Sequence, residues 1–331
     1  MGEGMRYTKD IQPYNKFWGN CIVNMFLSIL TKVDCSYDPL AYLNYYEYTY
    51  YPDNVFHLDY TQEYYNFFAK NIFKYEPYYF KNKENFLQEF KDILMNNPYV
   101  TLNVDLYNWN KFSYYYNKIH TSHFAFVMGF DEEKDVFYAF EDDVNLFYDI
   151  REIPTNEVIQ AFNSSHKQIK TDYRILSFKN DFIPPYEIDI KQFIKCTEQL
   201  IYNLDMLIEK QEVVNKKMIN EDTSKIHHYN YEFSKISNRL KGNKLLLCML
   251  KEKGLLNESL THELNEVLDE SCITWKNLQG IYLKHCLRNN FAELDNIEEK
   301  ISEAFMTEKE VWEKVIENIN RGCCKTESFL F

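Results

Sequence analysis

The feature that most constrains the fold is a change of sequence texture at Pro184-Pro185. Of the 28 tyrosines, 24 lie at or before Tyr186. Before this step the sequence mixes helical and β-rich runs, and after it the sequence is typical of helices joined by polar connectors. Because helices tend to end before a proline, we place a domain boundary here. We expect a first domain at residues 1–184 and a helical bundle domain at residues 185–331, sizes that fit a chain of 331 residues.

The second part has a heptad-like spacing of apolar residues. Phe193, Leu200, Leu207 and Val214 recur at every seventh position, which is typical of an amphipathic helix in a bundle. Further helices are predicted at 245–253, 263–288 and 292–319. A loop is predicted at 220–230, where His227 and His228 are adjacent and cannot both face one metal from a regular helix.

The first part combines one strongly apolar helix with several short strands. Residues 22–33 are apolar nearly all round, which predicts a buried helix, and Asn20 is a plausible N-cap. Alternating or short apolar runs predict strands, and amphipathic runs predict two more helices. The strands are expected at 99–107, 124–130, 136–140, 146–150 and 173–178, and the helices at 83–95 and 155–162. This order predicts an α+β domain with a mostly antiparallel sheet.

Charge and composition exclude several classes of function. The chain has 37 Lys and Arg against 50 Asp and Glu, a formal net charge of −13, which argues against a general electrostatic grip on nucleic acid or on an anionic membrane. The N-terminal segment MGEGMRYTKDIQPYNKFWGN has no apolar core of signal-peptide length, and no stretch reaches the length of a membrane span, so we expect a cytoplasmic protein. The eight cysteines form no CxxC pair and predict free thiols without a structural metal.

Cys21 stands where the apolar helix should begin. The first turn of a helix carries unpaired N–H groups and partial positive charge, which stabilise a thiolate and favour its use as a nucleophile. The alternative interpretation is an inert buried thiol, which is common in proteins.

His123 begins the predicted strand HFAFVMGF, and a second strand, DVFYAF, returns after the polar tip DEEK. If the hairpin is centred between Glu132 and Glu133, His123 faces Asp142, with Cβ atoms roughly 5 Å apart. A carboxylate in that place fixes the tautomer of the imidazole and stabilises its charged form. A loop one residue different in length puts Asp143 there instead. The alternative interpretation is that His123 is a strand-end histidine without a role and that Asp142 and Asp143 belong to a solvated turn.

An acyl-transfer site also needs donors for the oxyanion of the tetrahedral intermediate. The backbone N–H of Cys21 is one donor. Asn15, six residues upstream, is the candidate for a side-chain amide donor, and Gln12 and Asn20 are the other amides nearby.

These residues resemble the papain-like cysteine fold in its C39-peptidase-like form over about residues 10–180. An amide, an Asn-Cys step at the mouth of an apolar helix, HFAFVMGFD and VFYAFEDD follow that family's order of Cys, His and Asp. The resemblance implies a catalytic triad of Cys21, His123 and Asp142, with Asn15 as the oxyanion residue. The family's peptidases usually carry Gln at the Asn15 position, and the Asp142-Asp143 pair leaves two choices of carboxylate.

With a helical domain after it, the layout is similar to acyltransferases of the butirosin-H type and to the papain-like amide-forming proteins of closthioamide-type assembly. The resemblance implies an enzyme of antibiotic, thiotemplated natural-product biosynthesis. It would move an acyl or peptidyl group from a carrier-protein thioester, through acyl-Cys21, to a small-molecule amine. The phosphopantetheine arm would come from the carrier protein, and no other cofactor is implied. The tyrosines at 42, 45, 46, 48, 50 and 51 either wall the acyl pocket or pack in the core.

Carrier proteins are usually acidic, so docking requires a local basic patch on this acidic chain. The candidates are Arg239 with Lys241 and Lys244, and Lys284 with Arg288, although each set also fits a solvated helix face. Two other functions use the same residues: a cysteine peptidase or amidase with water as acceptor, and a non-catalytic scaffold with a degenerate papain-like domain. A metal site at His120 and His123 lacks a clear set of further ligands.

Overall fold

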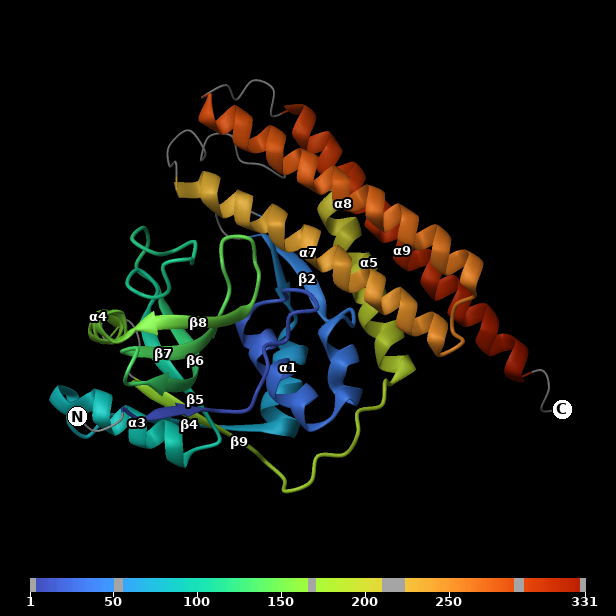
Figure 1. Ribbon diagram of the computed structural model, residues 1–331. Helices are drawn as coiled ribbons and strands as arrows, with labels where there is room; N and C mark the ends of the chain where they lie inside the picture. The colour runs from blue at the N-terminus through green and yellow to red at the C-terminus, as the bar shows by residue number, and fades with distance from the viewer. Residues whose placement is uncertain (1–3, 51–55, 166–170, 210–223, 289–294, 328–331) are drawn as a thin grey trace. The chain divides into compact units, whose positions relative to one another are not determined.

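The computed structural model describes residues 4–50, 56–165, 171–209, 224–288 and 295–327 (Figure 1). The fold is α+β, with a mostly antiparallel sheet and several helices, as the sequence predicts. The chain forms two compact units. The first comprises Met1–Tyr37 and Tyr65–Pro185, and the second comprises Asp38–Tyr64 and Tyr186–Phe331. The division at Pro185 lies at the Pro-Pro step, whereas segment 38–64 belongs with the helices of the second unit.

The first unit is built on a sheet whose described strands pair antiparallel in the order β4-β9-β5-β6-β7-β8, with β1 added beside β6. Helices and short turns connect the strands. The strands are β1 (Arg6–Thr8), β4 (Phe73–Tyr78), β5 (Tyr99–Asp105), β6 (Ser122–Asp131), β7 (Val136–Glu141), β8 (Asp149–Pro154) and β9 (Tyr173–Phe178). The helical elements are α1 (Cys21–Val33), α2 (Gln62–Phe67, across the unit division), η2 (Phe68–Ile72), η3 (Lys83–Asn85), α3 (Phe86–Asn96) and α4 (Thr155–Ser165).

Side chains alternate across the sheet, so its two faces have different partners. On one face Val100, Leu102 and Val127 form a core with Phe90 of α3 and Phe162 of α4. On the opposite face Phe26 of α1 stacks on Phe68 and Phe73. Burial of these large rings stabilises the unit and packs α1 against the sheet.

The β6–β7 hairpin has a different register from the one predicted. Asp131 pairs with Val136, so the turn is centred one residue later than expected. The Asp131 carboxylate accepts the Glu133 and Lys134 N–H groups, and Asp135 adopts φ 54°, which fixes this turn. A β-bulge between Val127 and Gly129 then shifts the pairing again. The prediction that His123 faces Asp142 is therefore wrong.

Gly129 allows β1 to lie close to β6 at the bulge. A Cβ atom at this position would lie 2.1 Å from the Tyr7 carbonyl oxygen. Such a contact is not compatible with a side chain, so glycine is required where Thr8 pairs with Gly129.

The strand predicted at 146–150 begins later, at Asp149. Leu146 adopts φ 60°, and its N–H donates to the Asp143 carbonyl oxygen. The Asp143 carboxylate also accepts the N–H groups of Asn145 and Phe147. These bonds form a turn before β8, which an apolar pattern does not reveal.

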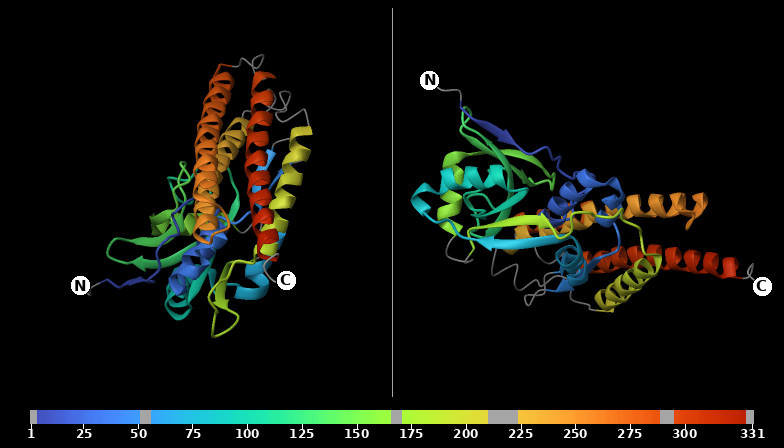
Figure 2. Two further views of the ribbon diagram at one scale, coloured as in Figure 1. Left: turned by 90° about the vertical axis from the view of Figure 1, so that its right-hand side faces the viewer. Right: turned by 90° about the horizontal axis from the view of Figure 1, so that it is seen from below.

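The second unit contains α5 (Ile190–Glu209), α7 (Ser224–Glu252), α8 (Glu258–Leu287) and α9 (Asp295–Glu327). Helix α8 packs against both α7 and α9, and α5 packs against α9 (Figure 2). The predicted loop at 220–230 is wrong from Ser224 onward, because α7 begins there, and 220–223 lie outside the described residues, as does Val214. Among the described helices, none is long and apolar enough to cross a membrane.

The same unit includes a hairpin of β2 (Tyr46–Tyr50) and β3 (Phe56–Tyr60), preceded by the 3-10 helix η1 (Cys35–Ala41), most of which lies in this unit. Tyr46 and Tyr48 donate their hydroxyls to the two oxygens of the buried Glu308 carboxylate, at 2.5 and 2.6 Å. The buried Arg239 guanidinium binds backbone carbonyl groups of 41–43. This polar network explains why the hairpin belongs to the helical unit.

Candidate active site

Cys21 is the first residue of α1, as predicted. Asn20 is extended (φ −161°, ψ 169°), its side-chain oxygen accepts the Val23 N–H at 2.8 Å, and its carbonyl accepts the Asn24 N–H at 2.9 Å. The N–H groups of Cys21 and Ile22 therefore have no acceptor within the described part of the chain. The thiol lies among the unpaired donors of a helix start, where negative charge is stabilised.

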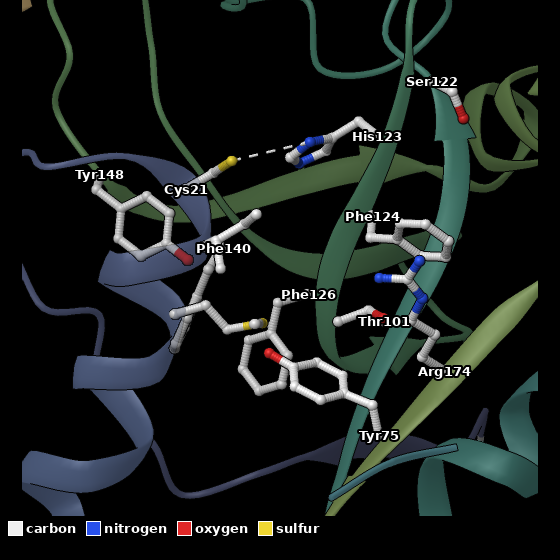
Figure 3. A pocket seen from close by; sticks show the side chains of 12 residues that line it. Cys21, Tyr75, Thr101, Ser122, His123, Phe124, Phe126, Phe140, Tyr148 and Arg174 are labelled. Atoms are coloured by element: carbon white, nitrogen blue, oxygen red, sulfur yellow. Dashed lines mark hydrogen bonds between the residues drawn. The ribbon is translucent and has the colours of Figure 1, made fainter. Parts of the chain in front are cut away.

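His123, at the start of β6, lies beside this thiol. Cys21 Sγ is 3.9 Å from His123 Nδ1, although 102 positions separate the two residues (Figure 3). Both side chains are partly buried. A thiol and an imidazole at this distance can act as a nucleophile and its base after a small movement.

The carboxylate beside His123 belongs to Glu141, the last residue of β7. Glu141 Oε1 is 3.6 Å from His123 Nε2, and the same oxygen accepts the Trp109 indole N–H at 2.7 Å. Glu141 is 3% exposed and Trp109 is fully buried. Trp109 thus fixes the carboxylate that in turn orients the imidazole.

The strand register explains why Glu141, and not the predicted Asp142, lies beside His123. Phe126 pairs with Phe140, so odd-numbered residues of β6 share a face with odd-numbered residues of β7. His123 and Glu141 are both odd. Asp142 follows the strand, and Asp143 is engaged by the turn and by the Arg151 guanidinium at 3.2 Å.

The charges of the site affect one another. Burial lowers the pKa of His123, but the Cys21 thiolate and the Glu141 carboxylate outweigh it and leave the pKa well above its usual value. Burial and the neighbouring Glu141 charge raise the pKa of Asp142 to about 7, against the opposing effects of His123 and of a hydrogen bond with Trp18. The surroundings of His123 therefore favour its protonated form, and those of Asp142 favour its neutral form.

A cavity of about 200 Å³ opens at the Cys21–His123 pair (Figure 3). It is mainly apolar and aromatic, with a few polar groups at its ends. Its lining residues are Cys21, Ile22, Met25, Tyr75, Thr101, Ser122, His123, Phe124, Phe126, Phe140, Tyr148 and Arg174.

Asn15 does not line this cavity, and its side chain is exposed, so the structure gives no support to the predicted oxyanion role. Asn20 caps the helix, and its amide donates to the Tyr65 hydroxyl at 2.6 Å. The donors near the thiol are the backbone N–H groups of Cys21 and Ile22. Tyr148 also lines the cavity, and Figure 3 shows its hydroxyl on the same side as Cys21.

The crowded tyrosines of 42–48 do not line this cavity. Tyr42, Tyr46 and Tyr48 are buried in the second unit, the Tyr50 side chain and Tyr51 lie outside the described residues, and the tyrosines that line the cavity are Tyr75 and Tyr148. Among the described His, Cys, Asp and Glu side chains, no group of three is placed to hold a metal ion.

Sequence reasoning missed Glu141, Trp109, Tyr148 and Arg174. The EDD run at 141–143 contains the carboxylate that lies beside His123, but choosing it required knowledge of the bulge and of the turn length. Gly129 was the available signal, because glycine inside a strand marks bulges and close backbone approaches.

No protein-family model matches the chain, and no curated protein matches it.

Proposed function

We propose that the chain is an acyltransferase that forms amide bonds through an acyl-Cys21 intermediate. The observation that carries the proposal is the 3.9 Å approach of Cys21 Sγ, at the start of α1, to His123 Nδ1. Glu141 takes the orienting role expected of Asp142.

We further infer a papain-like fold for the first unit and a bundle domain for the second. A nucleophile at the start of a helix and a histidine at the start of a strand in an antiparallel sheet support the first inference. Four long helices support the second, although this unit also contains a β-hairpin.

In the first half-reaction the Cys21 thiolate attacks the carbonyl carbon of a thioester. The oxyanion lies against the Cys21 and Ile22 N–H groups. The bond to the donor sulfur breaks, and the donor thiol leaves with the proton that His123 held. Cys21 is then acylated.

In the second half-reaction an amine attacks the acyl-Cys21 carbonyl. His123 Nδ1 takes a proton from the amine, the bond to Sγ breaks, and the thiolate is restored beside imidazolium. Glu141, held by Trp109, keeps the imidazole oriented through both steps. The aromatic walls of the cavity limit access of water to the acyl-enzyme.

The acyl donor in this proposal is a carrier-protein thioester, as in natural-product biosynthesis, and the acceptor is a small amine. A cysteine hydrolase uses the same residues with water as acceptor. Incubation with an acyl thioester and an amine distinguishes the two by the product. Mainly amide supports acyl transfer, mainly free acid supports the hydrolase, and absence of both with no adduct on Cys21 supports a scaffold without catalysis.

A further inference from the structure

The cavity that begins at Cys21 has a second polar end at Arg174. Arg174 lies on β9 opposite Thr101 of β5, and both residues line the cavity. Figure 3 shows the guanidinium between the Phe124 ring and Thr101, away from the Cys21 sulfur. A molecule that fills the cavity from the thiol therefore meets a cation at its other end.

The Arg174 guanidinium has no anionic or hydrogen-bonding partner within the described part of the chain. The guanidinium carbon lies over the Phe124 ring, whose centroid is 3.6 Å away, and the Tyr75 hydroxyl is close enough to interact with it electrostatically. The side chain is partly buried, and burial lowers the pKa of the guanidinium. A guanidinium has five N–H donors, and taking it out of water is unfavourable unless an anion or acceptor pairs with it.

Two other arginines of the protein differ from Arg174, because their guanidinium groups bind carbonyl or carboxylate oxygens of the chain. Arg239, buried in the second unit, binds backbone carbonyls of 41–43. Arg151 binds the Asp143 carboxylate and the Phe147 carbonyl. Arg174 makes no such bond, although it is held in place by the ring beneath it, so its donors are available to a bound molecule.

Thr101 is a second polar group at this end without a partner. It is 2% exposed, and its hydroxyl has no hydrogen bond to any described residue. A buried hydroxyl left unpaired is unfavourable by about 1–3 kcal/mol. The pairing of Thr101 with Arg174 across two strands places both unpaired groups at one end of the cavity.

The walls between the two ends are apolar. Phe126, Phe140 and Met25 contribute ring and thioether surface, and Tyr75 and Tyr148 contribute the faces of phenol rings. This surface fits a hydrocarbon or aromatic chain. Between the two ends, the only described lining side chain that could bind an anion as a cation is His123. Its imidazole already has the Glu141 carboxylate as a neighbour.

We propose that the cavity selects acyl groups that end in a carboxylate, with the terminal carboxylate bound by Arg174 and the thioester carbonyl at Cys21. The inference rests on the proposed function and names the class of its acyl donor. A bidentate pair between guanidinium and carboxylate is strong and directional, so it would fix both the length and the orientation of the acyl chain.

The kinetic test uses N-acetylcysteamine thioesters of dicarboxylic acids of increasing length, each compared with its neutral terminal carboxamide. The rate of Cys21 acylation is followed by intact mass. The carboxylate of the best length should acylate Cys21 about 10- to 100-fold faster than its carboxamide, the range for a charge-assisted pair. Arg174→Met should remove this preference, Arg174→Lys should keep part of it, and Arg321→Met, a charge-matched control at an exposed position, should leave it unchanged.

A binding test separates the failure of this inference from the failure of the proposed function. In the Cys21→Ala variant, calorimetry measures binding of the same carboxylates as unreactive amides in place of thioesters. Binding that requires Arg174 supports the cavity assignment even if no acyl transfer occurs. Melting temperatures of the Arg174 variants show whether they fold. If the wild-type protein is acylated at equal rates by each carboxylate thioester and its carboxamide, the inference is overturned, but the proposed acyl transfer is not.

Discussion

Two adjacent carboxylates near His123 differ in what they can do. Glu141 is buried, is held by Trp109 and lies 3.6 Å from His123 Nε2. Asp142 lies next to it, and burial together with the Glu141 charge raises its pKa to about 7. Burial and the nearby Glu141 charge therefore make Asp142 the harder group to ionise at neutral pH.

We predict that Glu141→Gln slows acylation of Cys21 far more than Asp142→Asn does. The Gln variant keeps the shape but removes the charge that holds imidazolium, and a loss on the order of 100-fold or more is expected from related catalytic histidines. Single-turnover acylation by a thioester measures both rates. A larger loss in Asp142→Asn would return the orienting role to Asp142.

Asp142→Asn should also stabilise the protein above neutral pH. Because its folded pKa is about 7 against an ordinary 3.8, ionised Asp142 opposes folding. This effect is absent near pH 4, grows as the pH rises to 7 and stays constant above it. The gain should reach about 4 kcal/mol at pH 8, since one pKa unit corresponds to about 1.4 kcal/mol. Chemical denaturation at pH 4, 6 and 8 measures it, and a gain that is the same at every pH would contradict the assignment.

At the scale of elements, the start of α1 depends on Asn20. Its side chain caps the helix through Val23 and donates to Tyr65. The cap determines which N–H groups remain unpaired around Cys21, so helix stability and thiol reactivity have a common origin.

Asn20→Ala should therefore lower both stability, by about 1 kcal/mol, and the rate of Cys21 alkylation by iodoacetamide. Asn20→Ser should restore most of both. Asn20→Asp should restore stability but slow alkylation, because a carboxylate beside the thiolate opposes its charge. Equal alkylation rates for the Ser and Asp variants would show that the electrostatics of the helix start do not govern the thiol.

Sequence patterns predicted most elements of the first unit well and their register poorly. The apolar run starting at Ile22 and the alternation in β5 reflect burial of side chains, which local sequence contains. The pairing of β6 with β7 depends on the Asp131 turn and on the bulge beside Gly129, which involve the approach of β1 from another part of the chain. One residue of shift changes every opposed pair. The sequence therefore predicted that Cys21 and His123 lie together, but not that Glu141 is the carboxylate beside His123.

At the scale of the whole molecule, the sequence indicated a boundary at Pro184-Pro185 but not the place of 38–64. That segment resembles the first part in its tyrosine content, yet Tyr46 and Tyr48 bind Glu308 of α9, 260 or more positions away. Contacts over such separations depend on the packed fold and leave no local pattern.

The proposed carrier protein would need a basic docking surface, and the structure places the two candidate patches differently. Arg239 is 2% exposed and binds backbone carbonyls, and Lys244 pairs with Asp269, so the patch predicted around Arg239 is wrong. Lys284 and Arg288 are both exposed, one turn apart at the end of α8. No acidic side chain pairs with either in the part of the chain that the structure describes.

We predict that Lys284→Glu with Arg288→Glu weakens turnover of a carrier-bound thioester about tenfold and leaves turnover of a small free thioester unchanged, because charge reversal repels an acidic carrier. The same reversal at Arg321, which pairs with Glu317 on α9, serves as the matched control. An equal loss with both donors would indicate damage to the fold, and no loss with either would remove this docking surface.

The most direct measurement of the central claim is the intact mass of the protein after brief exposure to an acyl thioester. Wild type should gain one acyl group, mapped to Cys21 by peptide fragmentation, Cys21→Ala should gain none, and His123→Ala should gain it at least 100-fold more slowly. An adduct on another cysteine, or equal acylation of Cys21 without His123, would contradict the account.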